Sequence, residues 1–121
     1  TTMITTDHLV CKTKLWIETT ENKCIIGDGK FILLKTIEQQ GSLKKAVQIL
    51  NISYRKAWND INEINKNLGI NLIEKHRGGN SRGSSSLTDD GKKLIKAYEK
   101  LQTKLKKNTD KIFLEFLKNL K

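Results

Sequence analysis

The sequence predicts a mostly α-helical α+β fold, and three features of the chain predict it. Between residues 31 and 69, apolar residues recur at helical spacing and are bounded by residues that start and stop helices. Alternating β-branched and aromatic residues before this region are typical of a strand pair. After it, a glycine- and serine-rich loop lies between two short apolar stretches, and a long amphipathic stretch follows.

The first residues are predicted to hold a flexible segment and a β-hairpin. Residues 1–8 (TTMITTDH) are expected to be unstructured, and their TMIT string resembles a vector-derived leader. Residues 9–18 alternate as a strand does, residues 19–23 form a turn, and Cys24–Ile26 return as the second strand. Trp16 is expected to be an aromatic residue of the core.

The stretch from Gly27 to Gln40 is expected to be a turn followed by the first helix. The GDG string at 27–29 is too short for a phosphate-binding loop without a downstream Lys-Ser/Thr pair, so it is assigned to the turn. Phe31, Leu34 and Ile37 then repeat at helical spacing. This helix is expected to pack behind the two that follow.

Residues 41–69 are predicted to form two helices joined by a tight turn. Ser42 and Ser53 are suitable N-caps, because a serine hydroxyl can accept a hydrogen bond from an unpaired helix N–H. Asn51 and Gly69 suit the helix ends, because both residue types tolerate left-handed backbone. The two apolar faces consist of Leu43, Ala46, Val47 and Leu50, then Ala57, Ile61, Ile64 and Leu68. This is the layout of a helix-turn-helix, whose second helix enters the DNA major groove.

Residues 70–87 are predicted to form a β-hairpin with a basic, glycine-rich tip. Residues 70–77 suit a short strand, and residues 84–87 can return as its partner. A glycine-rich tip lets the backbone approach a phosphate or enter a minor groove, whereas a merely solvated loop is the alternative. Such a hairpin after a helix-turn-helix makes a winged helix-turn-helix.

Residues 89–121 are predicted to form a long dimerisation helix with Thr88 as its N-cap. Its apolar residues from Leu94 to Ile112 recur at nearly heptad spacing, and such a seam suits a two-stranded helix pair. The alternative is a break at 108–110 that would give a separate, shorter C-terminal helix. The chain is accordingly expected to divide into 1–8, a winged helix-turn-helix domain at 9–88, and the helix. The residues expected at the dimer seam are Leu94, Tyr98, Leu101, Leu105, Ile112 and Phe116.

The chain is strongly basic. It has 23 Lys and Arg against 13 Asp and Glu, a net charge of +10, and residues 92–121 hold ten basic and three acidic residues. This balance favours polyanions through counterion release, and solvated surface lysines are the alternative. No stretch approaches the roughly 20 apolar residues that cross a bilayer, and no secretory signal is recognised, so we expect a cytoplasmic protein without membrane contact.

No catalytic site, metal or cofactor is expected. The sequence shows no nucleophile with a matched base and no carboxylate pair with a supporting pocket, so the chain is not expected to be an enzyme. Cys11 and Cys24 lack the CxxC spacing of metal sites, and neither His8 nor His76 lies at ligand spacing. Reduced structural thiols are expected, with a metal-binding or redox-sensing pair as the alternative.

The second helix of the pair carries polar residues opposite its apolar face. Arginine commonly reads guanine, asparagine reads adenine, and lysine also binds phosphates, although a solvated face would look similar. Trp58 is expected to wedge the helix onto the scaffold, and the hydroxyl of Tyr54 could reach a phosphate. The predicted DNA contacts are Ser42, Ser53, Tyr54, Arg55, Lys56, Asn59, Asn62, Lys75, Arg77 and Arg82.

Residues 12–105 resemble the N-terminal domain of the molybdate-responsive regulator family ModE. The matching strings are GSLKKA, ISYRKAW, the E-x-N of EIN, the glycine-rich wing HRGGNSRG and LTDDGKKLI. The G-S and L-T-x-x-G parts are also similar to LysR-type regulators. The Tyr-x-x-Ala-Trp string and the glycine-rich wing favour ModE.

The resemblance implies a winged-helix domain that dimerises through its long helix and binds a palindromic operator. It implies that Tyr54, Arg55, Lys56 and Asn59 belong to the reading helix, and that Arg77 and Arg82 belong to the wing. ModE proper continues into oxyanion-binding domains, for which this sequence has no room, so molybdate or tungstate binding is not expected of it. We therefore expect a homodimeric, sequence-specific transcription regulator, with a non-specific architectural DNA-binding protein as the alternative.

Overall fold

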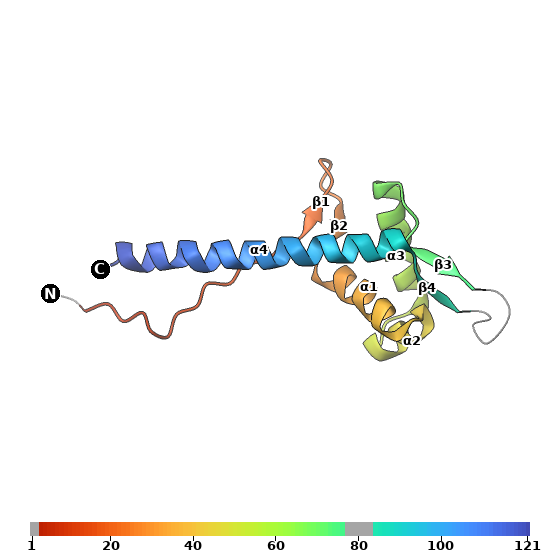
Figure 1. Ribbon diagram of the computed structural model, residues 1–121, viewed down its shortest axis with the longest axis horizontal. Coiled ribbons are helices and arrows are strands. Elements are labelled where there is room, and N and C mark those ends of the chain that lie inside the picture. Colours follow the sequence, from red (N-terminus) through yellow and green to blue (C-terminus); the bar gives the residue numbers. More distant parts are fainter. Residues whose placement is uncertain (1–2, 77–83) are drawn as a thin grey trace. The chain divides into compact units, whose positions relative to one another are not determined.

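The computed structural model describes residues 3–76 and 84–121, and it is mostly helical with two small antiparallel sheets. The elements follow the order β1, β2, α1, α2, α3, β3, β4, α4, as labelled in Figure 1. The α+β class predicted from the sequence is confirmed, and α1 to β4 form a winged-helix-like arrangement. The chain divides into two compact units: Trp16–Ala97, here called the helix-turn-helix unit, and the described part of 1–15 with Tyr98–Lys121, here called the terminal unit. The predicted division at residues 8 and 88 stays a prediction.

The N-terminal hairpin is much shorter than predicted. β1 covers only Ile17–Glu18 and β2 covers Cys24–Ile26, so the strand expected over 9–18 is wrong for its first eight residues. A strand needs a hydrogen-bonded neighbour, and β2 offers three residues before Gly27 turns the chain into a helix. The turn at 19–23 is confirmed, since its ends are joined by a backbone hydrogen bond of 2.8 Å.

Trp16 is not the core residue that the sequence predicted. Its side chain is 48% exposed, and its indole N–H donates to Glu18 Oε1 at 2.7 Å. The indole thus lies on the surface with its polar edge satisfied by a neighbour two residues along the chain.

α1 covers Asp28–Gln40 and begins earlier than predicted. Gly27 is its N-cap, so Asp28 and Gly29 belong to the first helical turn and not to a separate turn. The carboxylate of Asp28 suits this position because it faces the positive end of the helix dipole. Gly41 ends the helix with a left-handed backbone (φ 70°).

α2 (Leu43–Leu50) and α3 (Tyr54–Leu68) start and stop where the sequence predicted. The Ser42 and Ser53 hydroxyls accept hydrogen bonds from the backbone N–H groups three residues on, at 3.2 and 3.0 Å. Asn51 and Gly69 close the two helices with left-handed backbone, φ 53° and 67°. Leu68 does not join the buried stripe expected of it, because it lies in the last position before Gly69 and is 43% exposed.

β3 (Ile73–Lys75) and β4 (Ser85–Leu87) pair antiparallel and confirm the second predicted hairpin in a narrower form. Thr88 then caps α4, because its hydroxyl oxygen accepts from the Gly91 N–H at 3.1 Å. The same hydroxyl donates to the Asn71 carbonyl oxygen, which fixes the start of α4 to the chain before β3.

The core of the helix-turn-helix unit lies between α1, α2, α3 and the hairpins, with the start of α4 contributing Ile95. Its most deeply buried side chains are Ile26, Leu33, Leu34, Ile37, Leu43, Ala46, Ala57, Ile61, Ile64, Leu72 and Ile95. Among the predicted stripe residues of α2 and α3, Leu43, Ala46, Ala57, Ile61 and Ile64 are in the core, whereas Leu50 is half-buried and Leu68 is exposed. Apolar spacing therefore located the core faces of both helices but not their ends.

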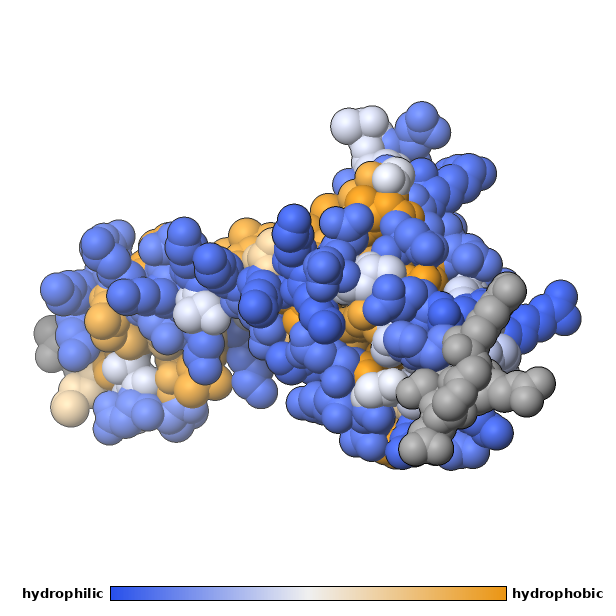
Figure 2. Space-filling view, turned by 45° about the vertical axis from the view of Figure 1, so that its right-hand side comes forward, coloured by the Kyte–Doolittle hydropathy of each residue, from blue (hydrophilic) through white to orange (hydrophobic). Residues whose placement is uncertain are grey.

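α4 covers Asp89–Asn119 as one continuous helix. The alternative break at 108–110 is therefore not observed. Figure 2 shows apolar side chains exposed among charged ones on the terminal unit, to which the C-terminal part of α4 belongs. No helix within residues 3–76 and 84–121 is long and apolar enough to cross a membrane.

Candidate nucleic-acid interface

α3 has one buried face and one exposed polar face. Ala57, Ile61 and Ile64 are at most 1% exposed and face the core. Because a helix repeats every 3.6 residues, positions halfway around the turn from these three point to solvent. The exposed residues that lie there are Arg55, Asn59, Asn62 and Lys66, spaced by 4, 3 and 4. An arginine and two asparagines on one exposed helix face are suited to hydrogen bonds with base edges.

The turn between α2 and α3 holds the exposed face in a fixed orientation. Only Asn51, Ile52 and Ser53 separate the helices, and the Ile52 N–H donates to the Val47 carbonyl oxygen at 3.2 Å. Ser42 and Ser53 were predicted as DNA contacts, and both hydroxyl oxygens already accept a capping hydrogen bond. Each hydroxyl still has its proton to donate, so a cap and a phosphate contact are compatible.

The acidic residues of α3 lie close to cations of the protein. Lys56 Nζ is 3.3 Å from Asp60 Oδ2, one turn along the same helix. Lys30 Nζ of α1 is 3.6 Å from Glu63 Oε2 and also donates to the Cys24 carbonyl oxygen at 3.0 Å. These pairs lower the negative charge that α3 would present to a polyanion.

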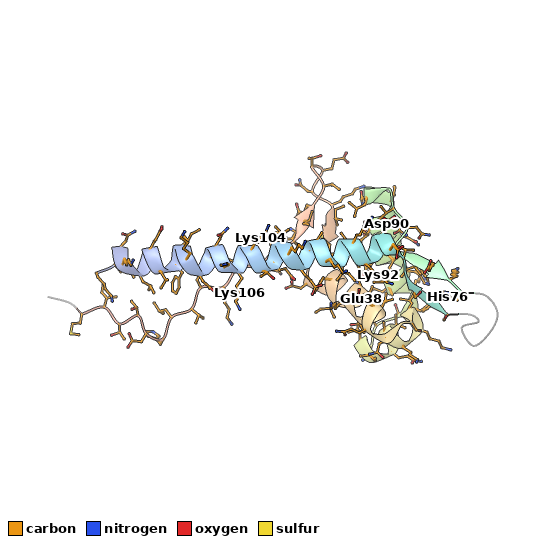
Figure 3. The ribbon with its side chains drawn as sticks, in the orientation of Figure 1. Glu38, His76, Asp90, Lys92, Lys104 and Lys106 are labelled. Atoms are coloured by element: carbon orange, nitrogen blue, oxygen red, sulfur yellow. The ribbon has the colours of Figure 1, made fainter. Side chains whose placement is uncertain are left out.

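The β3–β4 hairpin follows α3 and presents two different faces. The register pairs Ile73 with Leu87, Glu74 with Ser86 and Lys75 with Ser85, and directly opposite residues share a face. His76 lies at the outer end of β3 (Figure 3), where its backbone N–H donates to the Ser84 carbonyl oxygen at 2.9 Å. Its Nε2 also lies 2.6 Å from Ser86 Oγ, which ties the two strands together. The predicted wing residues Arg77 and Arg82 lie outside the described residues.

The structure brings Lys75 of β3 next to α3. Lys75 Nζ lies 5.4 Å from the centroid of the Trp58 ring. The Tyr54 ring meets the same indole edge-on, with centroids 6.2 Å apart and planes at 74°. Trp58 is half-buried, in line with the packing role expected of it, whereas Tyr54 is 50% exposed.

Asn65 is a structural residue whose role the sequence reasoning missed. Its side-chain Oδ1 accepts from the backbone N–H of Leu72 at 2.9 Å, and Leu72 is fully buried. Its backbone carbonyl oxygen accepts from Gly69 and Ile70. Asn65 thus connects the end of α3 to the chain that enters β3. The available signal was the E-x-N string, whose asparagine sits one turn before the helix-ending glycine.

The predicted dimer residues lie in different environments along α4. Leu94 is half-buried in the helix-turn-helix unit, and Tyr98 is 2% exposed, with its hydroxyl donating to the Leu15 carbonyl oxygen at 3.0 Å. Farther along the helix, Ile112 and Phe116 are 62% and 51% exposed. The remaining two, Leu101 and Leu105, are exposed and half-buried, respectively.

A groove of about 470 Å³ lies beside the exposed end of this seam, within the terminal unit. The Phe113 and Phe116 rings stack there with centroids 5.9 Å apart. The lining residues are Cys11, Thr13, Thr109, Ile112, Phe113 and Phe116. Dimerisation through this surface stays a prediction.

Among the described residues, no three His, Cys, Asp or Glu side chains gather as they would around a metal ion. Cys11 and Cys24 are both exposed free thiols. The exposed polar residues named above lie on α3 and at the β3–β4 hairpin, and their role in binding stays a prediction.

Comparison with known proteins gives a consistent result. The chain is 36% identical to the transcriptional regulator ModE of Yersinia pestis over 74 residues, which cover 61% of this chain and 28% of that protein. It is 35% identical to the DNA-binding transcriptional dual regulator ModE of Escherichia coli (strain K12) over 81 residues, 67% of this chain and 31% of that protein. This chain contains a ModE-like region. The molybdenum transport protein ModE of Azotobacter vinelandii is 29% identical over 87 residues, 72% of this chain and 32% of that protein.

The ModE-like region accounts for the greater part of the chain, yet the alignments span less than a third of each ModE relative. No family model matches the chain. The resemblance seen in the sequence is confirmed by these relatives.

Proposed function

We propose that this chain is a sequence-specific DNA-binding transcription regulator that acts in the cytoplasm. In this proposal α3 enters the major groove and the β3–β4 hairpin contacts the flanking backbone. The observation that carries it is the exposed face of α3, where Arg55, Asn59 and Asn62 lie opposite a fully buried apolar face. The printed names of the Yersinia and Escherichia relatives, both transcriptional regulators, support the same assignment.

The roles of the polar residues follow from their positions. Residues at the start of a recognition helix reach deepest into the groove, so Arg55 and Asn59 are assigned to base edges. Tyr54 and Lys56 lie to either side of the line through Arg55 and Asn59, and Ser53 is the N-cap, so these three residues are assigned to phosphates. Asn62 extends the base-reading face by one turn.

Wing and scaffold residues are assigned to the DNA backbone. Lys75 of β3 and Ser42 at the start of α2 would contact phosphates, as would Arg77 and Arg82 in the wing. Arg82→Ala should therefore weaken binding evenly across sequences, because a phosphate contact carries no sequence information.

We further propose that the regulator works as a homodimer on a palindrome. α4 has 31 residues, about 46 Å at the rise of an α-helix, and its end exposes the seam residues Ile112 and Phe116. In a dimer paired along this seam, each α3 would read one half-site of the palindrome. The centres of the two half-sites would be about 34 Å apart, which is one helical turn of DNA, or a multiple of that distance. A palindromic selected sequence would support this arrangement.

The experiment is selection of bound duplexes from a random pool, with the unaltered chain and with Arg55→Ala combined with Asn59→Ala. We expect a palindromic consensus from the unaltered chain and a lost or altered one from the variant. Lys106→Ala combined with Gln39→Ala is the matched control, because it removes one cation and one amide from exposed positions outside α3, the β3–β4 hairpin and the predicted dimer seam. An unchanged consensus in the Arg55 and Asn59 variant would refute the assignment of this face.

Two further outcomes separate the alternatives. Equal affinity for the selected and random duplexes would favour a non-specific architectural protein. The net charge of +10 would support such binding through contacts with phosphates. Selection repeated with molybdate or tungstate tests the expected indifference to these oxyanions.

A further inference from the structure

We propose that Trp58 is a positioning residue that holds the Lys75 ammonium between α3 and the β3–β4 hairpin, where it meets a DNA phosphate. This inference rests on the proposed DNA-binding function and adds a specific device to it. The device links the recognition helix to the wing through two side chains that lie 17 positions apart in the sequence.

The strand geometry of β3 directs Lys75 toward α3. Alternate residues of a strand share a face, so Lys75 lies on the same face as Ile73. Ile73 is 4% exposed, and Ser85, the cross-strand partner of Lys75, is also buried. The Lys75 side chain therefore projects from the core-facing side of the hairpin, at the edge of the core.

Trp58 receives the ammonium in a defined geometry. The distance of 5.4 Å from Lys75 Nζ to the indole centroid lies within the roughly 6 Å range of cation–π attraction, and tryptophan is the strongest partner. Tyr54, one helical turn earlier, packs edge-on against the same indole. The half-buried position and the Tyr54 contact restrain the ring that the ammonium meets.

The ammonium remains available to an anion. Glu74 precedes Lys75 but lies on the opposite face, paired with Ser86. The carboxylates of Asp60 and Glu63 lie beside Lys56 and Lys30, and no ion pair is recorded for Lys75 among residues 3–76 and 84–121. A lysine ammonium held by an aromatic ring has no carboxylate that compensates its charge, so it can pair with a phosphate. Because the ring already restrains the side chain, less side-chain entropy is lost on binding than for a freely moving lysine.

The test measures duplex affinity of the full chain against salt concentration for Lys75→Ala, Trp58→Leu, Trp58→Phe and the Lys75→Ala, Trp58→Leu double variant. The probe is a short duplex of mixed sequence. Loss of Lys75 should lower the slope of log affinity against log salt by about 1, as expected for one phosphate contact. Trp58→Leu should weaken binding about two- to fivefold, the size of an exposed cation–π contact, and Trp58→Phe should retain most of the affinity.

The double variant distinguishes positioning from packing. If Trp58 acts through Lys75, the double variant binds no more weakly than Lys75→Ala alone. If Trp58→Leu costs the same factor with and without Lys75, the tryptophan only packs and the inference is overturned. A complete absence of salt-dependent binding by the unaltered chain would overturn both the proposed function and this inference.

A second measurement needs no DNA and no variant. In the unbound, unaltered chain, the ring current of Trp58 should shift the NMR signals of the Lys75 side-chain methylene protons next to the ammonium upfield, relative to those of exposed Lys66. Unshifted Lys75 signals would overturn the inference while leaving the DNA-binding proposal standing.

Discussion

The hydrogen bond from the Leu72 N–H to Asn65 Oδ1 gives a direct test of how α3 is joined to the wing. The donor and acceptor are 2.9 Å apart, Leu72 is fully buried, and Asn65 is half-buried. Asn65→Ala removes the acceptor and leaves the Leu72 N–H inside the core without its partner. The change touches none of the exposed residues assigned to DNA.

The size of the effect follows from two opposing terms. An unsatisfied buried N–H costs about 1–3 kcal/mol of unfolding free energy. Alanine is a better helix former than asparagine, and this difference raises the free energy of unfolding by up to about 0.7 kcal/mol. We therefore expect Asn65→Ala to destabilise the chain by about 0.3–3 kcal/mol.

Urea denaturation followed by circular dichroism measures this change, with Asn67→Ala as the matched control. Asn67 lies on the same helix, is exposed, and uses its side chain only to donate to the Glu63 carbonyl oxygen at 2.8 Å. Asn67→Ala gains the same helix propensity but leaves no buried N–H without a partner, so this variant should be as stable as the unaltered chain or slightly more stable. Asn65→Asp keeps an acceptor and should retain most of the stability. Equal free energies of unfolding for Asn65→Ala and Asn67→Ala would refute the reasoning.

Three further predictions concern the caps, the start of α4 and the dimer seam. Ser53→Ala should destabilise by about 1 kcal/mol in thermal denaturation, because the cap of α3 is lost. In Gly91→Ala the new Cβ would lie 2.9 Å from the Leu72 carbonyl oxygen, and this overlap should cost about 1–3 kcal/mol of unfolding free energy. The higher helix propensity of alanine offsets up to about 1 kcal/mol of that cost. Urea denaturation measures the net change, and a stabilised variant would contradict the overlap. Phe116→Glu should shift sedimentation from dimer to monomer, whereas Leu114→Glu on the opposite side of α4 should not, and equal behaviour of both would count against the seam.

The faces of the helices could be predicted because they depend on residues a few positions apart. The buried Ala57, Ile61 and Ile64 and the exposed Arg55 and Asn59 follow from helical periodicity alone. The limit of this reasoning appears at Leu68, where the periodic stripe continues but the helix end leaves nothing to cover the side chain.

The candidate surface was predicted in part. The exposed α3 residues and Lys75 were expected from residue type and position, and the structure adds that Lys75 lies beside Trp58. Asn65 was missed because its partner, Leu72, lies beyond the helix-ending glycine, where periodicity gives no information.

The sequence by itself determined where α2 and α3 begin and end. Ser42, Ser53, Asn51 and Gly69 act through hydrogen bonds and backbone conformations within a few residues, so their chemistry is local. Only the tertiary structure decided the short β1, the exposed Trp16, and the contacts of Lys75 and Asn65. A strand needs a paired neighbour, and an aromatic side chain needs a covering surface. A hydrogen bond or cation–π contact between distant residues needs the fold that brings them together.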